Sequence, residues 1–154
     1  SSEATVTLNK APLSVTANAA GKSYNGLAYT GGNGVAYSAF VNGEDFTVLG
    51  GSLTYGGTSQ GAINAGPYTI TPSGLTSSNY AITFHNGTLT VSPVALSITA
   101  NNDSKTYNKV AYVGGNGVAY SAFVNSEDSP VLGGALADLP RRSGRLPVEL
   151  AARM

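Results

Sequence analysis

Hydrophobic and polar residues alternate along most of the chain in short segments, and glycine, asparagine or proline separates one segment from the next. The segment from Leu13 to Ala17 alternates in this way, and so do the two segments on either side of Asn86-Gly87. A side-chain period of two residues is typical of a β-strand with one buried face. The pattern therefore predicts a mostly β fold, with about six or seven short strands in each structural unit.

The hydrophobic members of these segments define the expected core, because residues i and i+2 of a strand lie on the same face. Tyrosine is the commonest aromatic residue, with nine copies against four of phenylalanine, so several core positions are expected to be half-buried. The predicted core positions are Leu13, Val15, Tyr24, Val35, Tyr37, Phe40, Leu49, Leu53, Tyr68, Ile70, Ile82, Phe84, Leu89 and Val91.

Two local patterns specify connections between strands. Asn86-Gly87 lies between alternating segments, and Asn-Gly favours a type I′ turn, so a two-residue β-hairpin is predicted there. Asn42 precedes the acidic pair Glu44-Asp45, a sequence that suits the start of a helix because carboxylates stabilise its positive end. Gly50-Gly51 suits the helix end, which predicts one short helix over about residues 43–49.

An internal repeat organises the whole chain. The twelve residues from Gly31 to Asn42 recur unchanged from Gly114 to Asn125, an offset of 83 residues. The same offset relates Leu13–Ala17 to Leu96–Ala100. A fixed period of this kind is the signature of tandem modules.

The repeat predicts four segments. Residues 1–11 match the terminal strand of a preceding repeat, residues 12–94 form one complete unit, and residues 95–136 form a partial second unit. Residues 137–154 leave the pattern: they contain all four arginines of the chain and no aromatic residue. We expect this non-repeat tail to be aberrant, through truncation, frameshift or fusion, with a true terminal cap as the alternative.

The second unit is expected to be less ordered than the first. It has no counterpart of about residues 54–93, so its strands from Leu96 onward would keep unpaired edges and an incomplete core. Its counterpart of Gly26 is Lys109, and a non-glycine residue resists the positive φ of a tight turn.

Composition narrows the classes of function. Charged residues make up only 10% of the chain and the net charge is zero, so nothing favours binding to nucleic acid or to an anionic membrane. No hydrophobic run reaches the length needed for membrane insertion. Cysteine is absent, which excludes disulfides and suits an exported chain, and any export signal is expected upstream of Ser1.

Several motifs occur in a characteristic order: Lys22 to Gly26, Tyr37 to Asp45, Leu53 to Thr58, Asn64 to Tyr68, and Ser78 to Tyr80. Together they resemble the YDG-type and MBG-type repeats of filamentous-haemagglutinin-like surface proteins of Gram-negative bacteria. The resemblance covers residues 1 to about 136.

This resemblance implies small β-grasp-like modules with one short helix each; Ig-like β-sandwich repeats are the alternative fold. It also implies that the chain is secreted to the bacterial cell surface. There it would be a stalk segment of a large adhesin and would mediate or support adhesion. The partners expected are the neighbouring repeats of the same chain. In the alternative, each repeat itself binds a host glycan or protein.

The acidic pair Glu44-Asp45 is the main candidate for site chemistry. With Asn42 it could supply oxygen ligands to calcium, although helix-start electrostatics explain the same residues. The pair recurs as Glu127-Asp128 at the repeat period, as a structural feature does and an active site need not.

The remaining reactive side chains are few. His85 is the only histidine and lies beside a predicted turn, so we expect no catalytic triad, no zinc site, no cofactor and no enzymatic activity. Tyr37 and its repeat counterpart Tyr120 are the candidate ligand-facing aromatics, since aromatic rings suit both glycan and protein partners. Half-buried packing in a sheet is the other explanation for these tyrosines.

Overall fold

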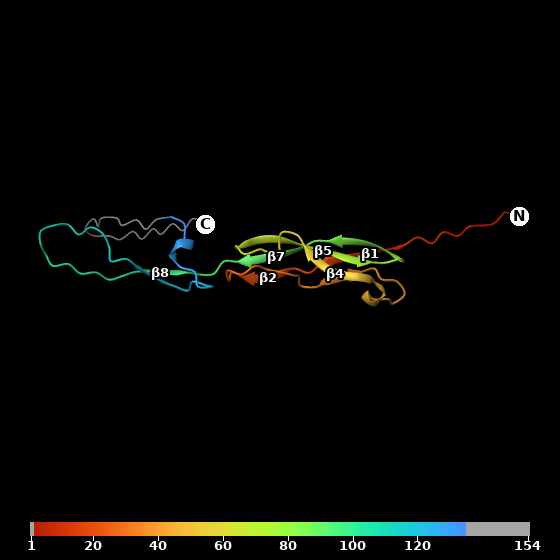
Figure 1. Cartoon of the computed structure of the whole chain (residues 1–154), viewed down its shortest axis with the longest axis horizontal. Coiled ribbons are helices and arrows are strands. Elements are labelled where there is room, and N and C mark those ends of the chain that lie inside the picture. The colour runs from red at the N-terminus through yellow and green to blue at the C-terminus, as the bar shows by residue number, and fades with distance from the viewer. Residues whose placement is uncertain (1, 135–154) are drawn as a thin grey trace. The chain divides into compact units, whose positions relative to one another are not determined.

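The computed structural model describes residues 2–134, and Figure 1 colours its strands by their position along the chain. The chain divides into two units, Ser1–Val94 and Ala95–Met154. The predicted non-repeat tail, residues 137–154, lies outside the described residues.

The first unit contains two β-sheets. One has the strand order β3-β1-β6 and consists of β1 (Ala11–Ala17), β3 (Val35–Ser38) and β6 (Tyr80–His85). The other has the order β2-β7-β5-β4 and consists of β2 (Ala20–Ser23), β4 (Gly50–Gly56), β5 (Gly66–Thr76) and β7 (Gly87–Ser92). The predicted mostly β fold is confirmed.

Two stretches of chain run alongside each other through both sheets. β1 is followed by β2 after Asn18-Ala19, and β6 is followed by β7 after Asn86. β1 pairs with β6 in parallel, and β2 pairs with β7 in parallel, with Gly21 opposite Thr90. Residues 11–23 and 80–92 therefore join the two sheets as one parallel pair.

The β-hairpin predicted at Asn86-Gly87 is wrong. β6 and β7 lie in different sheets, and neither residue has the positive φ that a type I′ turn needs. Gly87 is required for another reason: a Cβ atom there would lie 2.6 Å from the carbonyl oxygen of Ala17 and 2.9 Å from that of Asn18. The glycine thus allows two backbones to approach where the chain changes sheets.

The predicted core positions occupy the interior of the first unit. Five of them are fully buried: Leu13, Val15, Ile70, Leu89 and Val91. The other nine are half-buried. Burial of each large apolar side chain contributes about 1.5–3 kcal/mol relative to exposure, so these strand faces supply much of the stability.

Five more residues are buried that are not among the predicted core positions. Ser59 and Ala62 lie outside the strands, whereas Ala17, Pro72 and Tyr80 continue the period of two in β1, β5 and β6. Ser59 is tolerated in the core because its hydroxyl donates a hydrogen bond to the Gly56 carbonyl oxygen at 3.4 Å and its N–H donates to that of Thr69 at 3.0 Å.

The short helix predicted over residues 43–49 is reduced to one 3-10 turn, η1 (Phe46–Val48). Asn42 and Gly43 have φ values of 54° and 74°, so a right-handed helix cannot begin at either residue. Asp45, and not Asn42, is the N-cap, and its carboxylate accepts a hydrogen bond from the Thr47 N–H at 2.9 Å. The β-branched Thr47 and Val48 then disfavour a longer helix.

The second unit repeats part of this architecture. Its strands β8 (Ser97–Ala100) and β9 (Val118–Ser121) pair antiparallel, and η2 (Ser129–Val131) follows. The pairing of Ile98 with Tyr120 reproduces, at the 83-residue offset, that of Val15 with Tyr37. Within residues 95–134 no residue is fully buried.

Residues 103–106 are the counterpart of β2, yet they belong to no described strand. In the first unit β2 has β7 as its only strand partner. Among residues 95–134, no strand takes the place of β7. Residues 2–10, at the other end of the described chain, are likewise exposed and outside every strand.

Lys109 adopts the conformation that its side chain disfavours. Its φ is 62°, close to the 69° of Gly26. The turn is held in both units by an asparagine side chain: Asn25 Oδ1 accepts from the Leu27 N–H at 3.1 Å, and Asn108 Oδ1 accepts from the Val110 N–H at 3.0 Å. This hydrogen bond offsets the steric cost at Lys109.

Candidate functional site

Four aromatic side chains of the first unit meet near the end of β3 and the start of β6. Tyr37 lies 5.7 Å from Phe40 and 6.1 Å from Phe46 between ring centroids, and Phe40 lies edge-on to Tyr80 at 5.5 Å. Tyr80 is 2% exposed, whereas Phe46 is 59% exposed. This aromatic patch, defined as Tyr37, Phe40, Phe46 and Tyr80, therefore extends from the core to the surface.

The loop that carries Phe40 is bent by three residues whose backbone is in the left-handed region. Ala39, Asn42 and Gly43 all have positive φ, and the Glu44 N–H donates to the Val41 carbonyl oxygen at 3.0 Å. The turn brings the Val41 N–H to the hydroxyl of Tyr80, which accepts at 3.2 Å. The loop is thereby fastened to the first residue of β6.

The two carboxylates of the loop have separate partners. Glu44 accepts a hydrogen bond from the Tyr80 hydroxyl, and this bond to a negative acceptor raises the pKa of Tyr80 above its usual value. Asp45 accepts from the Thr47 hydroxyl and N–H, which lowers the pKa of Asp45. The loop thus uses both acids to hold itself in place.

The hydroxyl of Tyr80 should make the loop sensitive to alkali. Because the pKa of Tyr80 is raised in the folded state, its stabilising effect is complete below the ordinary pKa of about 10 and is lost as pH rises through the higher folded pKa. Tyr80→Phe should lower the denaturation midpoint at neutral pH and reduce its further fall in alkali, because the hydroxyl that bonds Glu44 is absent. Tyr107→Phe, at a residue 83% exposed, is the control and should leave the denaturation midpoint unchanged.

The calcium hypothesis for Asn42, Glu44 and Asp45 stays a prediction. Glu44 is directed to Tyr80 and Asp45 to Thr47, so calcium would compete with both hydrogen bonds. Among residues 2–134, no three or more histidine and acidic side chains are grouped to hold a metal ion.

Tyr120, the second ligand-facing candidate, occupies the same place in β9 as Tyr37 in β3. Its ring lies 5.6 Å from that of Phe123, the counterpart of Phe40. The counterpart of Phe46 is Ser129, so the exposed aromatic ring at this position belongs to the first unit only. Tyr37 and Tyr120 are both half-buried.

An asparagine clamp, which the alternation of hydrophobic and polar residues does not predict, closes the loop after the first strand in both units. In the first unit, Asn18 Nδ2 donates to the Asn33 carbonyl oxygen at 3.0 Å and Asn33 Nδ2 donates to that of Ala19 at 2.7 Å. Asn101 and Asn116 make the equivalent bonds in the second unit at 2.9 and 2.8 Å. Both asparagines recur at the 83-residue offset, and this recurrence is the sequence signal that could have indicated the clamp.

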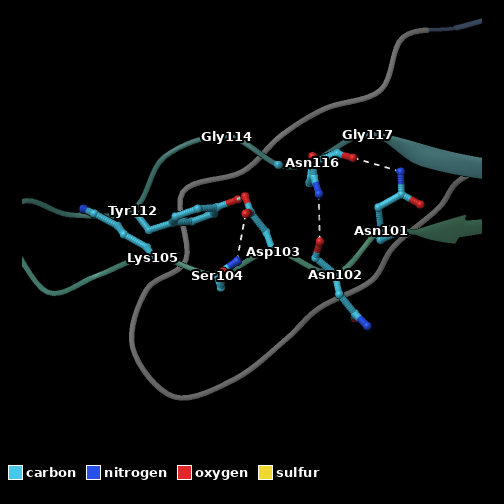
Figure 2. Close-up of a pocket in the computed structure, with 11 residues that line it drawn as sticks. Asn101, Asn102, Asp103, Ser104, Lys105, Tyr112, Gly114, Asn116 and Gly117 are labelled. Atoms are coloured by element: carbon cyan, nitrogen blue, oxygen red, sulfur yellow. Dashed lines mark hydrogen bonds between the residues drawn. The ribbon is translucent and has the colours of Figure 1, made fainter.

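The clamp of the second unit borders an open pocket of about 520 Å³ (Figure 2). It is lined by Ala100, Asn101, Asn102, Asp103, Ser104, Lys105, Tyr112, Gly114, Gly115, Asn116 and Gly117. Figure 2 shows the hydroxyl of Tyr112 directed at the carboxylate of Asp103. This hydrogen bond and one from the Ser104 N–H lower the pKa of Asp103.

The corresponding space in the first unit is filled by its own chain. The Gln60 side-chain amide accepts a hydrogen bond from the Gly31 N–H and donates one to the Gly31 carbonyl oxygen, both at 2.8 Å. The Tyr55 ring lies against Gly32, where a Cβ atom would come within 2.4 Å of the ring carbons. Tyr55 of β4 and Gln60 of the following loop therefore occupy, in the first unit, the space that is open in the second. Accordingly Tyr107 is 83% exposed, whereas its counterpart Tyr24 is half-buried against the core.

His85 lies at the end of β6, exposed and opposite Thr16 of β1. The aromatic patch does not include it. Within the described part of the chain, no helix has the length and hydrophobicity to cross a membrane.

The fold defines a class of protein: a small β-rich module, built of two sheets joined by one parallel pair and repeated along the chain at a fixed period. The family model described as MBG domain (YGX type) matches residues 13–90, about half of the chain. The chain belongs to this family of repeat modules, as the sequence motifs predicted. Comparisons with curated proteins and with solved structures gave no significant match.

Proposed function

We propose that the chain is a spacer segment of a large bacterial surface adhesin, in which tandem modules lengthen a stalk. The family suggests a repeat module of surface-associated proteins. Secretion to the cell surface of a Gram-negative bacterium is part of the same proposal. The neighbouring repeats of the chain are the partners it requires.

The observation that carries this proposal is the recurrence of one local structure in two units. Strand register, asparagine clamp, asparagine-held turn and 3-10 turn all recur at the offset of 83 residues. Recurring features serve the module and not one active site. Repeats that contact mainly their neighbours have roughly additive stability and give extended assemblies.

A chain of four concatenated copies of residues 12–94 tests the spacer role. Small-angle X-ray scattering should give a maximum dimension that grows in proportion to the number of copies, because each added module extends the rod. Chains of two and three copies supply the slope. A radius that grows only as a compact globule does would contradict the proposal.

The exposed part of the aromatic patch supports a second candidate function, direct binding of a host glycan or protein. Phe46 is 59% exposed beside Tyr37, and aromatic faces of this kind pack against sugar rings and apolar side chains. Binding on a glycan and matrix-protein array should then be weakened by Phe46→Ser, which installs the residue of the second unit. Tyr37→Ala and Tyr120→Ala separate the contributions of the two units, and retention of binding in all three variants would contradict this function.

A further inference from the structure

One loop of the first unit concentrates exposed hydrophobic side chains beside two acids. Val41, Phe46 and Val48 are 51%, 59% and 45% exposed, and every residue from 41 to 48 is exposed. Glu44 and Asp45 lie in the same segment, which is called the acidic loop (residues 41–48) from here on. Hydrophobic side chains that gather on a surface among polar residues mark interaction sites.

The acidic loop is held in one conformation by its own contacts. Asn42 has a φ of 54°, the Val41 N–H donates to the Tyr80 hydroxyl, and that hydroxyl donates to Glu44. Asp45 fixes the start of η1 through its bond to the Thr47 N–H. A partner would therefore bind a preformed surface and lose little affinity to ordering of the loop.

The frame of the acidic loop recurs, but its exposed ring does not. Residues 31–42 and 114–125 are identical, and Ala39 and Ala122 have φ values of 74° and 73°. Phe46 is replaced by Ser129 in the second unit. A constant frame that carries a variable exposed residue is typical of binding loops on a rigid scaffold.

Each carboxylate of the acidic loop uses only one oxygen to hold the loop. Asp45 accepts both bonds from Thr47 at Oδ1, and Glu44 accepts from Tyr80 at Oε2. Within residues 2–134, Asp45 Oδ2 and Glu44 Oε1 accept no hydrogen bond. The bonds from Thr47 lower the pKa of Asp45, so this carboxylate is negative at neutral pH.

The lysines of the first unit do not neutralise these acids. Lys10 and Lys22 are the only basic residues in positions 2–94, apart from the exposed His85. Lys10 Nζ donates to the Ser77 carbonyl oxygen at 2.9 Å, and Lys22 Nζ donates to that of Leu27 at 2.7 Å. Within this unit the acidic loop therefore presents negative charge and an open aromatic ring together.

We propose that the acidic loop binds a positively charged arginine side chain of a protein partner. The guanidinium group lies over the open part of the Phe46 ring, whose negative face attracts a cation. Its N–H groups donate to Asp45 Oδ2 and Glu44 Oε1. Val41 and Val48 offer apolar contact to the aliphatic part of the arginine and to its neighbours in the partner.

An organic cation suits the acidic loop better than a metal ion does. Calcium requires six to eight oxygen ligands, whereas a guanidinium group can take one oxygen from each carboxylate and leave the bonds to Tyr80 and Thr47 intact. The proposal rests on the direct-binding function, for which it names the class of partner. The spacer role does not depend on it.

NMR titration of the ¹⁵N-labelled 154-residue chain with the peptide acetyl-Gly-Arg-Gly-amide tests this inference. The amide signals of residues 44–47 should shift and saturate. The same peptide with citrulline in place of arginine keeps the shape and lacks the charge, so it should cause no shift. The lysine peptide should bind more weakly than the arginine peptide, because an ammonium group stacks less well on an aromatic ring.

Two variants separate the ring from the charges. Phe46→Ser should weaken binding of the arginine peptide by about 3-fold, as loss of an exposed cation–π contact does. Glu44→Gln combined with Asp45→Asn should weaken it by about 5-fold, because two exposed ion pairs are lost while an acceptor oxygen remains for Tyr80 and for Thr47.

Matched controls remove an exposed hydrophobic side chain or an acid elsewhere. Leu27→Ser, at a residue 55% exposed, and Glu3→Gln, at an exposed residue, should both leave binding of the arginine peptide unchanged. Equal shifts with arginine and citrulline, shifts confined to residues outside the acidic loop, or unchanged binding by Phe46→Ser would each overturn the proposal.

The glycan and matrix-protein array separates failure of this inference from failure of direct binding. Array binding to a glycan that Phe46→Ser weakens, without any shift by the arginine peptide, would overturn the arginine proposal and leave direct binding intact. Neither array binding nor a shift by the arginine peptide would contradict both. Shifts of residues 44–47 together with array binding to a protein support both.

Discussion

Leu89→Ala is expected to lower the free energy of unfolding of the first unit by about 3 kcal/mol, within the usual range of 2–5 kcal/mol for deletion of a fully buried leucine side chain. Leu89 is 0% exposed and packs with Ala17, Ala62, Ile70 and Val91. Its strand β7 lies between β2 and β5, so neighbouring strands restrict the collapse that would fill the cavity.

Thr90→Ala provides the control for this variant. Thr90 is the next residue of the same strand, is exposed, and should tolerate the change within about 0.5 kcal/mol. Native-state hydrogen exchange of amides in β5 and β7, together with urea denaturation, measures both variants. Equal losses for Leu89→Ala and Thr90→Ala would contradict a core centred on β7.

Local periodicity was enough to find most of the core. Leu13 and Val15 alternate with polar residues, and a strand places such residues on one buried face whatever its partners are. Alternation does not predict the burial of Ser59 and Ala62, because it depends on how the chain between β4 and β5 packs against the loop between β2 and β3. That contact is long-range and leaves no local period.

In the candidate site, too, the residue types follow from local patterns, whereas their contacts depend on the fold. Tyr37 was singled out as an aromatic residue on a strand, but its packing with Phe46 and the role of Tyr80 depend on the loop over residues 39–45. The acids Glu44-Asp45 suit a helix start after Asn42, but Asn42 and Gly43 have positive φ, and the N-cap is therefore Asp45. The bond between Val41 and Tyr80 joins residues 39 positions apart, so no local pattern could predict it.

Asn86-Gly87 is the clearest case in which a strong local preference was overruled. The dipeptide favours a hairpin, but β6 gains a parallel partner in β1, and β7 gains two partners in β2 and β5. Those ladders bury Leu89 and Val91, which contribute more than one tight turn can. The glycine remains essential, for its lack of a side chain and not for its conformational freedom.

Gly87→Ala is accordingly expected to destabilise the first unit by about 2 kcal/mol, as overpacking of a tight site does. Its Cβ would lie 2.6 Å from the Ala17 carbonyl oxygen and 2.9 Å from that of Asn18, and both are backbone atoms that cannot rotate away. Relief requires the two parallel stretches to separate where they pass between the sheets. Denaturation midpoints and hydrogen exchange in β1 and β7 should both report the loss.

Two controls separate this steric cause from a turn. Gly21→Ala adds a Cβ whose nearest contact is 3.9 Å away, so the change in stability should stay within about 0.5 kcal/mol. Asn86→Ala should be equally mild, because Asn86 is exposed and has no positive φ, whereas a type I′ turn would suffer from its loss. A large effect of Asn86→Ala, comparable to that of Gly87→Ala, would indicate a type I′ turn at these two residues and contradict the parallel pair that joins the two sheets.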